Sequence, residues 1–428
     1  MGLFPNKERA TAGTRMHDSC DVIGSRPRRC VVVGASVRGF VESAARRGWS
    51  VHAADLYGDG DLVASAVETV RLAAAGGGYP AGIPGAVADF PAAPLAYTGG
   101  LENHPAVIEV LARDRPLAGC GPAALTAVRD PARLDAVLRD AGLRMPDTFR
   151  SPAGLPCDGS FLVKPLASAG GRGIAAWRGI DARATEIPLV WQRRVRGAEW
   201  SASFVAGGGR AILVGVSRPV PGSRWCGCGE FAYCGSLNVP LDSIPDAMRH
   251  GLDTLVTALA AGFPLIGLCG ADLIVDHAGT MHVLEVNPRP TASMELIERA
   301  TGWSPAAAHF AAFGLDDDPP HPGAGGCVWA KAVAYAPRRR AANPAADAVA
   351  ALDDRWRSAD GRRALADVPA PGSTPAAGAP LMTVFARGES PAAAVATLRR
   401  RVLELRRACV GVSRPAAVAA RTPRGRTP

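Results

Sequence analysis

The first hydrophobic stretches of the chain follow the pattern of a β-α-β unit. In "RCVVVGASVRGFVESAARRGWSVHAADLYGD", an apolar run at 30–33 precedes a glycine turn, a helical pattern over about 40–47 and a second apolar run at 50–54. Such a unit builds a parallel sheet with a right-handed crossover. The turn from Gly34 to Gly39 matches neither the dinucleotide fingerprint nor a Walker loop. We therefore expect this turn to pack the helix on the strand rather than to contact a ligand.

The middle of the chain alternates short apolar runs with turns and ends in a hairpin pattern. A helix is predicted over 105–114, and a second one within "DPARLDAVLRDAGLRMPDTF" marks the entrance to a second domain. From Ser160 the pattern changes to short strands, which a helix over 244–261 follows. The runs "LIGLCGADLIVD" and "MHVLEVNP" flank the turn "HAGT", and this arrangement predicts a hairpin with Gly279 in its turn.

The last part of the chain predicts a smaller αβ lobe. An alanine-rich helix follows Pro305, a strand is expected over 327–335, and a polar, Arg-rich region precedes the strand "APLMTVFARG" and a helix over 391–409. These patterns divide the chain into five segments. They are a disordered tail (1–28), a parallel-sheet domain (29–125), a central domain (126–305), a C-terminal lobe (306–412) and a basic tail (413–428).

The composition is that of a folded protein without a membrane span. Its 428 residues are 48% hydrophobic, which allows a substantial core and two or three domains. No apolar stretch approaches the roughly 20 residues that span a bilayer, and residues 1–29 lack the apolar core of a signal peptide. The ten cysteines are scattered, and Cys226, Cys228 and Cys234 have no second pair to complete a zinc set. We expect a cytoplasmic protein with reduced thiols.

The net charge of +9 lies mainly at the two ends of the chain. Residues 1–29 carry a net charge of +3 and residues 413–428 a net charge of +4. This distribution is typical of solvated tails, so we expect no specific nucleic-acid partner. Among the 48 basic residues only Lys7, Lys164 and Lys331 are lysines. A lysine in so arginine-rich a chain indicates that a compact ammonium is required at its position.

Lys164 ends an apolar strand and is followed by a glycine-rich loop in "FLVKPLASAGGRGI". Glycines let the backbone approach phosphate oxygens closely, and an ammonium can neutralise the charge of two phosphates. The alternative is an ordinary hairpin turn whose lysine extends into water. These residues alone do not decide between the two interpretations.

Asp272, Glu285 and Asn287 place two carboxylates and an amide on adjacent strands of the predicted hairpin. Glu285 and Asn287 are two positions apart, so their side chains point to the same face. Oxygen ligands of this kind suit Mg²⁺, which leaves coordination positions for nucleotide phosphates. The alternative is a polar strand end in solvent, but the apolar neighbours indicate buried strands, where an unpaired carboxylate is costly.

Together these motifs resemble the ATP-grasp superfamily over residues 126–300. The shared order is a lysine, a glycine loop, "Q-x-x-x-x-G-x-E", an aspartate and "E-x-N-P-R", and the β-α-β region resembles the pre-ATP-grasp domain. The resemblance implies an α/β (α+β) ATP-grasp fold. Its parts would be a Rossmann-like pre-ATP-grasp domain at 29–125, an ATP-grasp domain at 126–305 and a small C-terminal αβ lobe.

The resemblance also assigns roles to residues. Lys164 would bind the α- and β-phosphates, the loop 167–173 would close over the triphosphate, and Glu199 would hold the ribose. The nucleotide-binding set it implies is Lys164, Ser168, Gly170, Gly171, Gly173, Gln192, Arg193, Val195 and Glu199. The implied metal ligands are Asp272, Glu285 and Asn287, which would hold two Mg²⁺ ions, with Mn²⁺ as an alternative.

Arg289 follows the implied metal ligands directly, and together with Lys164 it is the residue we expect to act in catalysis. A planar guanidinium suits bidentate binding of a carboxylate or of the transferred phosphoryl group. The alternative is a helix-capping or salt-bridge arginine.

The chain departs from the superfamily pattern at three places. Many relatives have an acidic residue where residues 192–194 run, and a first phosphate-binding lysine where this chain offers only Arg129 and Arg133. The arginine that usually precedes the first metal ligand is also absent, since Ala271 precedes Asp272. The metal site is therefore better supported than the nucleotide contacts.

The function that the resemblance implies is an ADP-forming carbon–nitrogen ligase. ATP-grasp enzymes typically phosphorylate a carboxylate, and an amine then attacks the acyl phosphate. The expected partners are ATP, a small-molecule carboxylate and an amine, without a membrane, and a homodimer is one expected assembly. The alternatives are carboxylation through carboxyphosphate, as in biotin carboxylase, and a non-catalytic ATP-binding or scaffold protein.

Two further stretches narrow this expectation. "GASVRGFVESAARRGWSVHAADLYGDGDL" and "DVPAPGSTPAAGAPLMTVFARGES" resemble ATP-grasp proteins of bacteria that use tetrahydromethanopterin-linked one-carbon transfer. This resemblance implies a pterin or furan cofactor precursor as the substrate, joined to glutamate.

Overall fold

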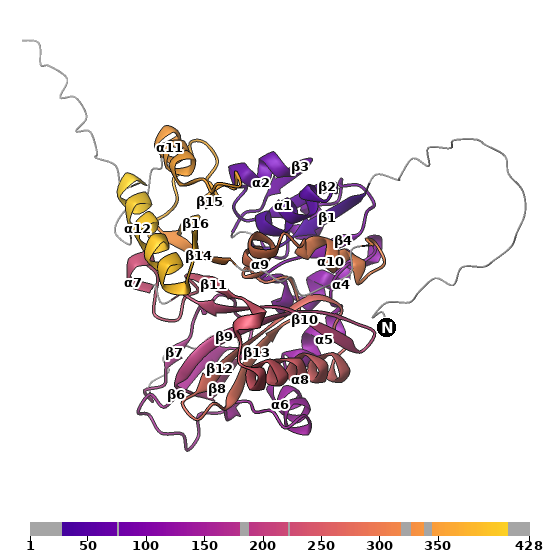
Figure 1. The fold of residues 1–428 in the computed structure, drawn as a ribbon. Helices are drawn as coiled ribbons and strands as arrows, with labels where there is room; N and C mark the ends of the chain where they lie inside the picture. Colours follow the sequence, from indigo (N-terminus) through magenta and orange to yellow (C-terminus); the bar gives the residue numbers. More distant parts are fainter. Residues whose placement is uncertain are drawn as a thin grey trace, which may run out of the picture.

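The N-terminal lobe is built on a four-stranded parallel sheet, which confirms the prediction from the β-α-β pattern (Figure 1). The computed structural model describes residues 28–74, 77–179, 188–220, 223–317, 327–337 and 345–409. The strand order is β3-β2-β1-β4. These strands are β1 (Arg29–Val33), β2 (Ser50–Asp55), β3 (Glu68–Arg71) and β4 (Leu95–Tyr97).

Helices cover both faces of this sheet, so alternate residues of β1 enter different cores. Val32 packs in the core that contains α1, whereas Val33 packs in the core that contains α3 and α4. The elements of this lobe are α1 (Arg38–Arg46), α2 (Gly60–Ser65), α3 (Ile83–Ala86), η1 (Leu101–Asn103) and α4 (Pro105–Asp114). Burial on both faces explains why the strands read as continuous apolar runs.

The glycine turn after β1 packs closely against the rest of the lobe. A Cβ atom on Gly34 would lie 2.1 Å from the Thr98 hydroxyl oxygen, and one on Gly39 would lie 3.5 Å from the Glu295 carboxylate. Glycine at position 34 is thus required by close approach. These contacts support the packing interpretation of the turn.

An eight-stranded sheet forms the centre of the molecule, in the order β13-β12-β9-β10-β11-β14-β16-β15. Its strands are β9 (Gly197–Gly207), β10 (Arg210–Pro219), β11 (Gly235–Val239), β12 (Gly267–Asp276), β13 (Met281–Asn287), β14 (Val328–Tyr335), β15 (Leu365–Ala366) and β16 (Pro380–Gly388). All neighbouring strands are antiparallel. The sheet therefore joins the central domain and the C-terminal lobe.

The two faces of this sheet have different coverings. Phe204 on β9 packs with α8 (Asp246–Gly262), whereas its neighbour Val205 packs with α1 and α10 (Pro305–Ala311). The second face becomes polar along the same strand, at Ser203 and Ser201. Since side chains alternate along a strand, this polar part is a continuation of the face that the helices cover elsewhere. The candidate site lies there.

A smaller antiparallel sheet carries Lys164, in the order β5-β8-β6-β7. Its strands are β5 (Thr148–Phe149), β6 (Phe161–Pro165), β7 (Ala175–Ala176) and β8 (Leu189–Arg193), and the helices α5 (Pro122–Val128) and α6 (Pro131–Asp140) precede it. Phe161, Val163, Trp177 and Trp191 form its core. The short strands predicted from Ser160 onward are confirmed.

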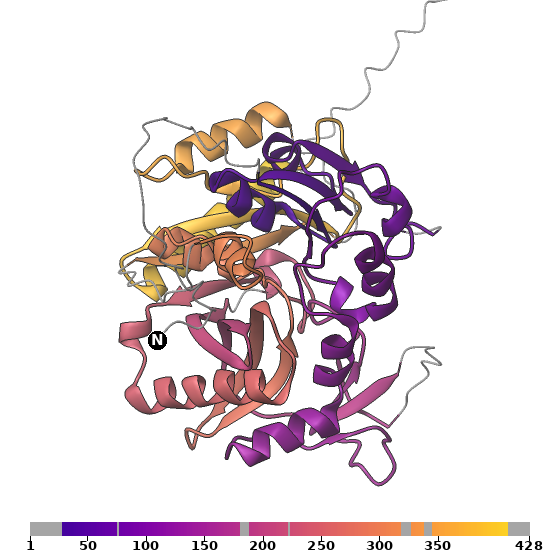
Figure 2. The same cartoon turned by 90° about the vertical axis from the view of Figure 1, so that its right-hand side faces the viewer.

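The C-terminal part has its own core but shares the central sheet. Its helices are α11 (Ala346–Trp356) and α12 (Pro391–Cys409), and α7 (Ser223–Cys226), η2 (Leu241–Ser243) and α9 (Met294–Thr301) complete the fold. The indigo N-terminal lobe and the orange-to-yellow C-terminal elements lie at one end of the molecule, and α8 lies toward the other (Figures 1 and 2).

The predicted tails lie almost wholly outside the described residues. Arg28, at the end of the predicted N-terminal tail, pairs with Asp316 at 2.9 Å. Within the described segments, no helix has the length and apolar character required to cross a membrane.

Candidate active site

The hairpin of β12 and β13 brings the predicted metal ligands together. Asp272 lies opposite Glu285, and Gly270 lies opposite Asn287, with Gly279 at φ 80° in the turn. The register shifts between Asp272 and Leu273, so the hairpin contains a bulge beside the carboxylates. The predicted hairpin is confirmed.

Asp272 is the centre of this group. Its Oδ1 accepts a hydrogen bond from Ser201 Oγ at 2.7 Å, and its Oδ2 accepts one from Asn287 Nδ2 at 3.0 Å. Burial, together with the nearby charge of Glu285, raises the pKa of Asp272 to about 6. Two carboxylates that face each other without a shared cation resist ionisation. A divalent cation would relieve this repulsion.

The donor set fits Mg²⁺ rather than a metal that needs a complete protein cage. Within the described residues, no three His, Cys, Asp or Glu side chains are grouped so that they could hold a metal. Two carboxylates and one amide suit an ion that retains water and phosphate oxygens as ligands. The Asn287 oxygen accepts a hydrogen bond from Arg289 Nη2 at 3.1 Å, so ligation by Asn287 would require its amide to rotate.

Lys164 lies close to the carboxylates, at the end of β6. Its Nζ donates to Gln192 Oε1 at 2.6 Å, and Gln192 Nε2 donates to Thr148 Oγ1 at 3.1 Å. Burial lowers the pKa of Lys164, while the charges of Glu285 and Asp272 act in the opposite direction. The ammonium is therefore within electrostatic range of both carboxylates. Gln192 thus provides a neutral acceptor for the ammonium.

The glycine loop is held against two neighbouring segments. Gly170, Gly171 and Gly173 have φ values of 64°, 75° and 79°. Asn103 Nδ2 donates to the Ser168 carbonyl at 3.3 Å, and the Tyr233 amide donates to the Gly170 carbonyl at 3.1 Å. A Cβ atom on Gly171 would lie 1.7 Å from the Phe231 carbonyl oxygen. Both the left-handed backbone and this close approach require glycine.

The other residues predicted to contact the nucleotide differ from one another in burial and in their partners. Gln192 is 3% exposed, and its side chain is engaged by Lys164 and Thr148. Arg193 is exposed and pairs with Asp147 at 2.8 Å, and Val195 is half-buried. Glu199 is exposed on β9 and shares the face of Ser201 and Asp272. An adenine contact in this segment would therefore use the backbone rather than the Gln192 side chain.

Arg289 is paired with a buried carboxylate of the N-terminal lobe. Its Nε donates to Glu102 Oε1 at 2.9 Å, and its Nη2 lies 2.8 Å from the same oxygen. Burial would raise the pKa of Glu102, but the Arg289 guanidinium outweighs it and the pKa is lowered. This arrangement corresponds to the salt-bridge interpretation, so a catalytic role for Arg289 stays a prediction.

Arg129 joins this group, whereas Arg133 does not. Arg129 Nη1 donates to the Leu166 carbonyl at 3.2 Å, and its Nη2 lies 3.5 Å from Glu102 Oε1. Its buried Nε has no hydrogen-bond partner within the described residues. Arg133 instead lies 5.6 Å from the centre of the Phe263 ring. Of the two arginines, Arg129 is thus the one that contacts the segment leading into the loop.

Ser201 and Glu102 are among the residues of the site that were not predicted. Ser201 lies two positions after Glu199, and strand alternation could have placed it on the same face. Glu102 is 187 residues from Arg289, so no local pattern indicates their pairing.

Cys226 and its neighbours Cys228 and Cys234 pack in the core of the C-terminal part. Cys226 is buried, its Sγ lies 3.8 Å from the Cys234 carbonyl oxygen, and contact with Cys234 together with burial raises the pKa of its thiol. A thiol of raised pKa is a poor metal ligand, because the thiolate is the binding form.

We compared the chain with known protein families and curated proteins. A family model described as an ATP-grasp domain matches residues 128–293. The carbamoyl phosphate synthase large chain of Ralstonia nicotianae is 24% identical over 239 residues, which cover 50% of this chain and 21% of that protein. The chain thus spans about a fifth of the length of this curated relative.

Three solved structures share the fold at low sequence identity. N5-carboxyaminoimidazole synthase of Aspergillus clavatus, in complex with ADP and 5-aminoimidazole ribonucleotide, has a TM-score of 0.66 at 13% identity, covering 88% of this chain and 98% of that one. L-amino acid ligase of Bacillus licheniformis has a TM-score of 0.61 at 16% identity, with 88% and 97% covered. The biotin carboxylase domain dimer of Hydrogenobacter thermophilus 2-oxoglutarate carboxylase, with MgADP and bicarbonate, has a TM-score of 0.63 at 13% identity, with 83% and 85% covered. Residues 128–293 therefore match the ATP-grasp domain model, and the chain has the ATP-grasp fold.

Proposed function

We propose that this protein is an ADP-forming ligase that phosphorylates a small-molecule carboxylate and joins it to an amine. The observation that carries the proposal is the convergence of Asp272, Glu285 and Asn287 beside Lys164, under a glycine loop held against Tyr233. Two carboxylates that face each other next to an ammonium are suited to a nucleotide that carries Mg²⁺.

The residues of the site would divide the work as follows. Asp272 and Glu285 would hold Mg²⁺, with Asn287 after rotation of its amide, and the ion would supply positive charge to offset that of the phosphates. Lys164 would neutralise the charge on the phosphates, with Arg129 beside it. The glycine loop would exclude water, which otherwise hydrolyses an acyl phosphate. Arg289 would orient the substrate carboxylate, provided that its guanidinium exchanges part of its contact with Glu102 for the substrate.

The finer assignment concerns the acid and the amine. The stretches at 34–62 and 367–390 resemble ATP-grasp proteins of bacterial tetrahydromethanopterin-linked one-carbon transfer. We therefore propose a pterin or furan cofactor precursor and glutamate as the first substrates to test, and one-carbon metabolism in the cytoplasm as the setting. A homodimer belongs to the same proposal, since the Hydrogenobacter thermophilus relative is a dimer.

A second candidate function is carboxylation through carboxyphosphate. Two of the fold relatives favour it, the carboxyaminoimidazole synthase and the bicarbonate-bound biotin carboxylase domain. In that case bicarbonate would replace the organic acid as the phosphoryl acceptor. A non-catalytic ATP-binding role would instead give nucleotide binding without turnover.

The deciding experiment measures phosphate and ADP release from Mg²⁺-ATP with paired acids and amines. Release that requires both an acid and an amine supports the ligase, whereas release that requires bicarbonate supports carboxylation. Glu285→Gln should lower turnover by about 10- to 100-fold, as expected for loss of a metal ligand. Glu109→Gln is the matched control, since Glu109 is exposed on α4. Equal turnover by the wild type and Glu285→Gln would contradict the metal assignment.

A further inference from the structure

The C-terminal lobe contains a cavity of about 550 Å³ that shares no residue with the candidate active site. It lies where β14 begins and β16 ends, between the loop 357–364 and α12. Trp329 and Trp356 form buried walls, at 3% and 7% exposure. A volume of roughly 300–1,000 Å³ is typical of small-molecule sites. The cavity is therefore large enough for a metabolite rather than a single ion.

Five arginines and one glutamate contribute to the lining of this cavity. The charged residues are Arg357, Arg362, Arg363, Arg387, Arg401 and Glu389. Three of the arginines belong to the loop and are paired with aspartates: Arg357 with Asp354 at 2.9 Å, Arg362 with Asp360 at 3.1 Å and Arg363 with Asp353 at 2.9 Å. The loop thus supplies guanidinium groups whose charge is partly neutralised.

Arg387 and Arg401 differ from the loop arginines. Arg387 Nη2 donates to Cys327 Sγ at 2.8 Å, and Arg401 Nη2 donates to the Trp356 carbonyl at 3.0 Å. Within the described part of the chain, neither guanidinium forms an ion pair with a carboxylate. Burial and the charge of Arg400 lower the pKa of Arg401, as expected where positive charge lacks a counter-ion. The guanidinium groups of Arg387 and Arg401 are therefore available to bind an anion in the cavity.

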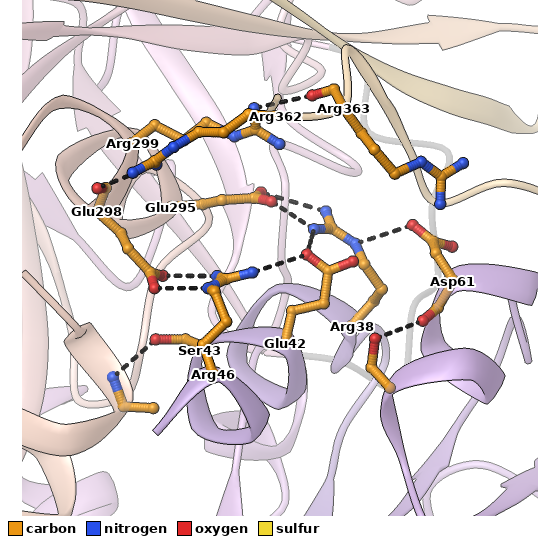
Figure 3. A network of polar contacts seen from close by, with 12 residues as sticks. Arg38, Glu42, Ser43, Arg46, Asp61, Glu295, Glu298, Arg299, Arg362 and Arg363 are labelled. Atoms are coloured by element: carbon orange, nitrogen blue, oxygen red, sulfur yellow. Dashed lines mark hydrogen bonds and ion pairs between the residues drawn. The ribbon is translucent and has the colours of Figure 1, made fainter. Parts of the chain in front are cut away.

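The arginine loop is fixed in place by α9. Arg362 Nη1 donates to the Glu298 carbonyl at 3.3 Å, and the Arg363 carbonyl accepts from Arg299 Nη1 at 2.9 Å (Figure 3). The Asp353 carboxylate also accepts hydrogen bonds from the Ala364 and Leu365 amides, both at 2.8 Å. A loop anchored at both sides loses little conformational entropy when a ligand binds. The cavity is thus a preorganised site.

We propose that this cavity binds a phosphate-bearing small molecule, with Arg387 and Arg401 as the principal ligands of the phosphate group. Guanidinium groups present parallel N–H donors that match phosphate oxygens, and two uncompensated cations match a dianion. The remaining volume accommodates the organic part, between the tryptophan walls and the loop.

The test is isothermal titration of the full chain with glycerol 3-phosphate at constant ionic strength. We expect saturable one-to-one binding that Arg387→Gln weakens by at least about tenfold, the usual effect of losing a charged hydrogen bond. Arg401→Gln serves as a second variant, and a thermal melt shows whether each variant is folded. Arg139→Gln is the control, since Arg139 is exposed on α6, pairs with Asp135 and does not line the cavity.

Three results would overturn the proposal. One is the lack of saturable binding by the wild type at millimolar concentration, and another is equal affinity of the folded Arg387→Gln variant. The third is loss of binding in Lys164→Gln but not in Arg387→Gln, because the phosphate would then occupy the nucleotide site. Citrate, at matched ionic strength, distinguishes phosphate from a general anion, and equal affinity for citrate would contradict the phosphate assignment.

Discussion

Two clusters of charge on one face of the central sheet differ in whether the protein itself completes them. In the first, Asp272 faces Glu285, and burial and this second carboxylate raise the pKa of Asp272 to about 6. In the second, Glu295 accepts from Arg38 Nη2 at 3.2 Å and from Lys331 Nζ at 3.1 Å. There the cations outweigh the effect of burial and lower the pKa of Glu295.

This difference indicates that the Glu295 cluster has a structural role and that the Asp272 and Glu285 carboxylates have a role in ligand binding. The Glu295 cluster is internally neutralised. Arg38 links Glu295 on α9 to α1 (Figure 3), and Lys331 links it to β14. Arg38, Lys331 and Glu295 are 2%, 5% and 8% exposed. Within the described residues, no cation forms an ion pair with Asp272 or Glu285, and the Lys164 ammonium near them donates to Gln192 instead. A buried charge that a protein leaves uncompensated is a candidate for ligand binding. Four predictions test this contrast.

The largest effect is expected for Asp272→Asn. The substitution removes a proposed metal ligand, so phosphate release should fall by about 100-fold or more. It also removes the repulsion with Glu285, so the melting temperature of the metal-free protein should stay the same or rise. Activity and thermal melts measure the two quantities. A strongly destabilised variant, or one with full turnover, would contradict the contrast.

Glu295→Gln should lower stability, whereas Asp272→Asn should lower turnover. It leaves Arg38 and Lys331 without their shared carboxylate, which should lower the free energy of unfolding by about 3–5 kcal/mol. Urea denaturation measures this change. Glu404→Gln is the control, because Glu404 forms an exposed pair with Arg355 and should change stability by under about 1 kcal/mol. An unfolding free energy equal to that of the control would show that the cluster is not structural.

The pH dependence of stability should follow Glu295. Its pKa in the folded protein is below the ordinary value of 4.5, so its contribution is present above pH 4.5 and is lost as pH falls through the lowered pKa. The stability difference between the wild type and Glu295→Gln should therefore shrink as pH falls below 4.5. Denaturation midpoints at several pH values measure this difference. A constant difference across this range would contradict the assignment.

The smallest effect is expected for Ser201→Ala. Loss of its hydrogen bond to Asp272 should weaken Mn²⁺ binding by about two- to tenfold. Ser203→Ala is a matched control on the same strand, since the Ser203 hydroxyl has no hydrogen-bond partner within the described residues. Titration with Mn²⁺ in the presence of ADP compares them. Equal Mn²⁺ affinities of the two variants would show that Ser201 does not support the metal site.

Much of the fold could be predicted from local patterns. The helix over 105–114 and the strand end at Lys164 follow from periodicity and flanking turns, and the structure has α4 at Pro105–Asp114 and β6 at Phe161–Pro165. No helix was predicted in the polar, Arg-rich region. The structure has α11 there, and its Val349, Leu352 and Trp356 lie on one buried face. The short helix α9 was also not predicted, and its acidic residues pair with Arg38 and Arg46 of the N-terminal lobe and with Lys331 of β14.

The parts that escaped prediction depend on contacts between distant segments. The continuity of the central sheet follows from the pairing of β11 with β14, which are separated by about 90 residues, and no local pattern encodes that partner. The same reason applies to Glu102 and Arg289. In contrast, Asp272, Glu285 and Asn287 were predicted together because hairpin pairing and strand alternation are local.

The most direct test of the central claim is anomalous diffraction from crystals of the protein with Mn²⁺ and ADP. The account predicts a manganese peak bound by oxygens of Asp272 and Glu285 and by the phosphates, with the Asn287 amide rotated toward the ion. A peak elsewhere, or ADP bound with these carboxylates turned away from any ion, would contradict it.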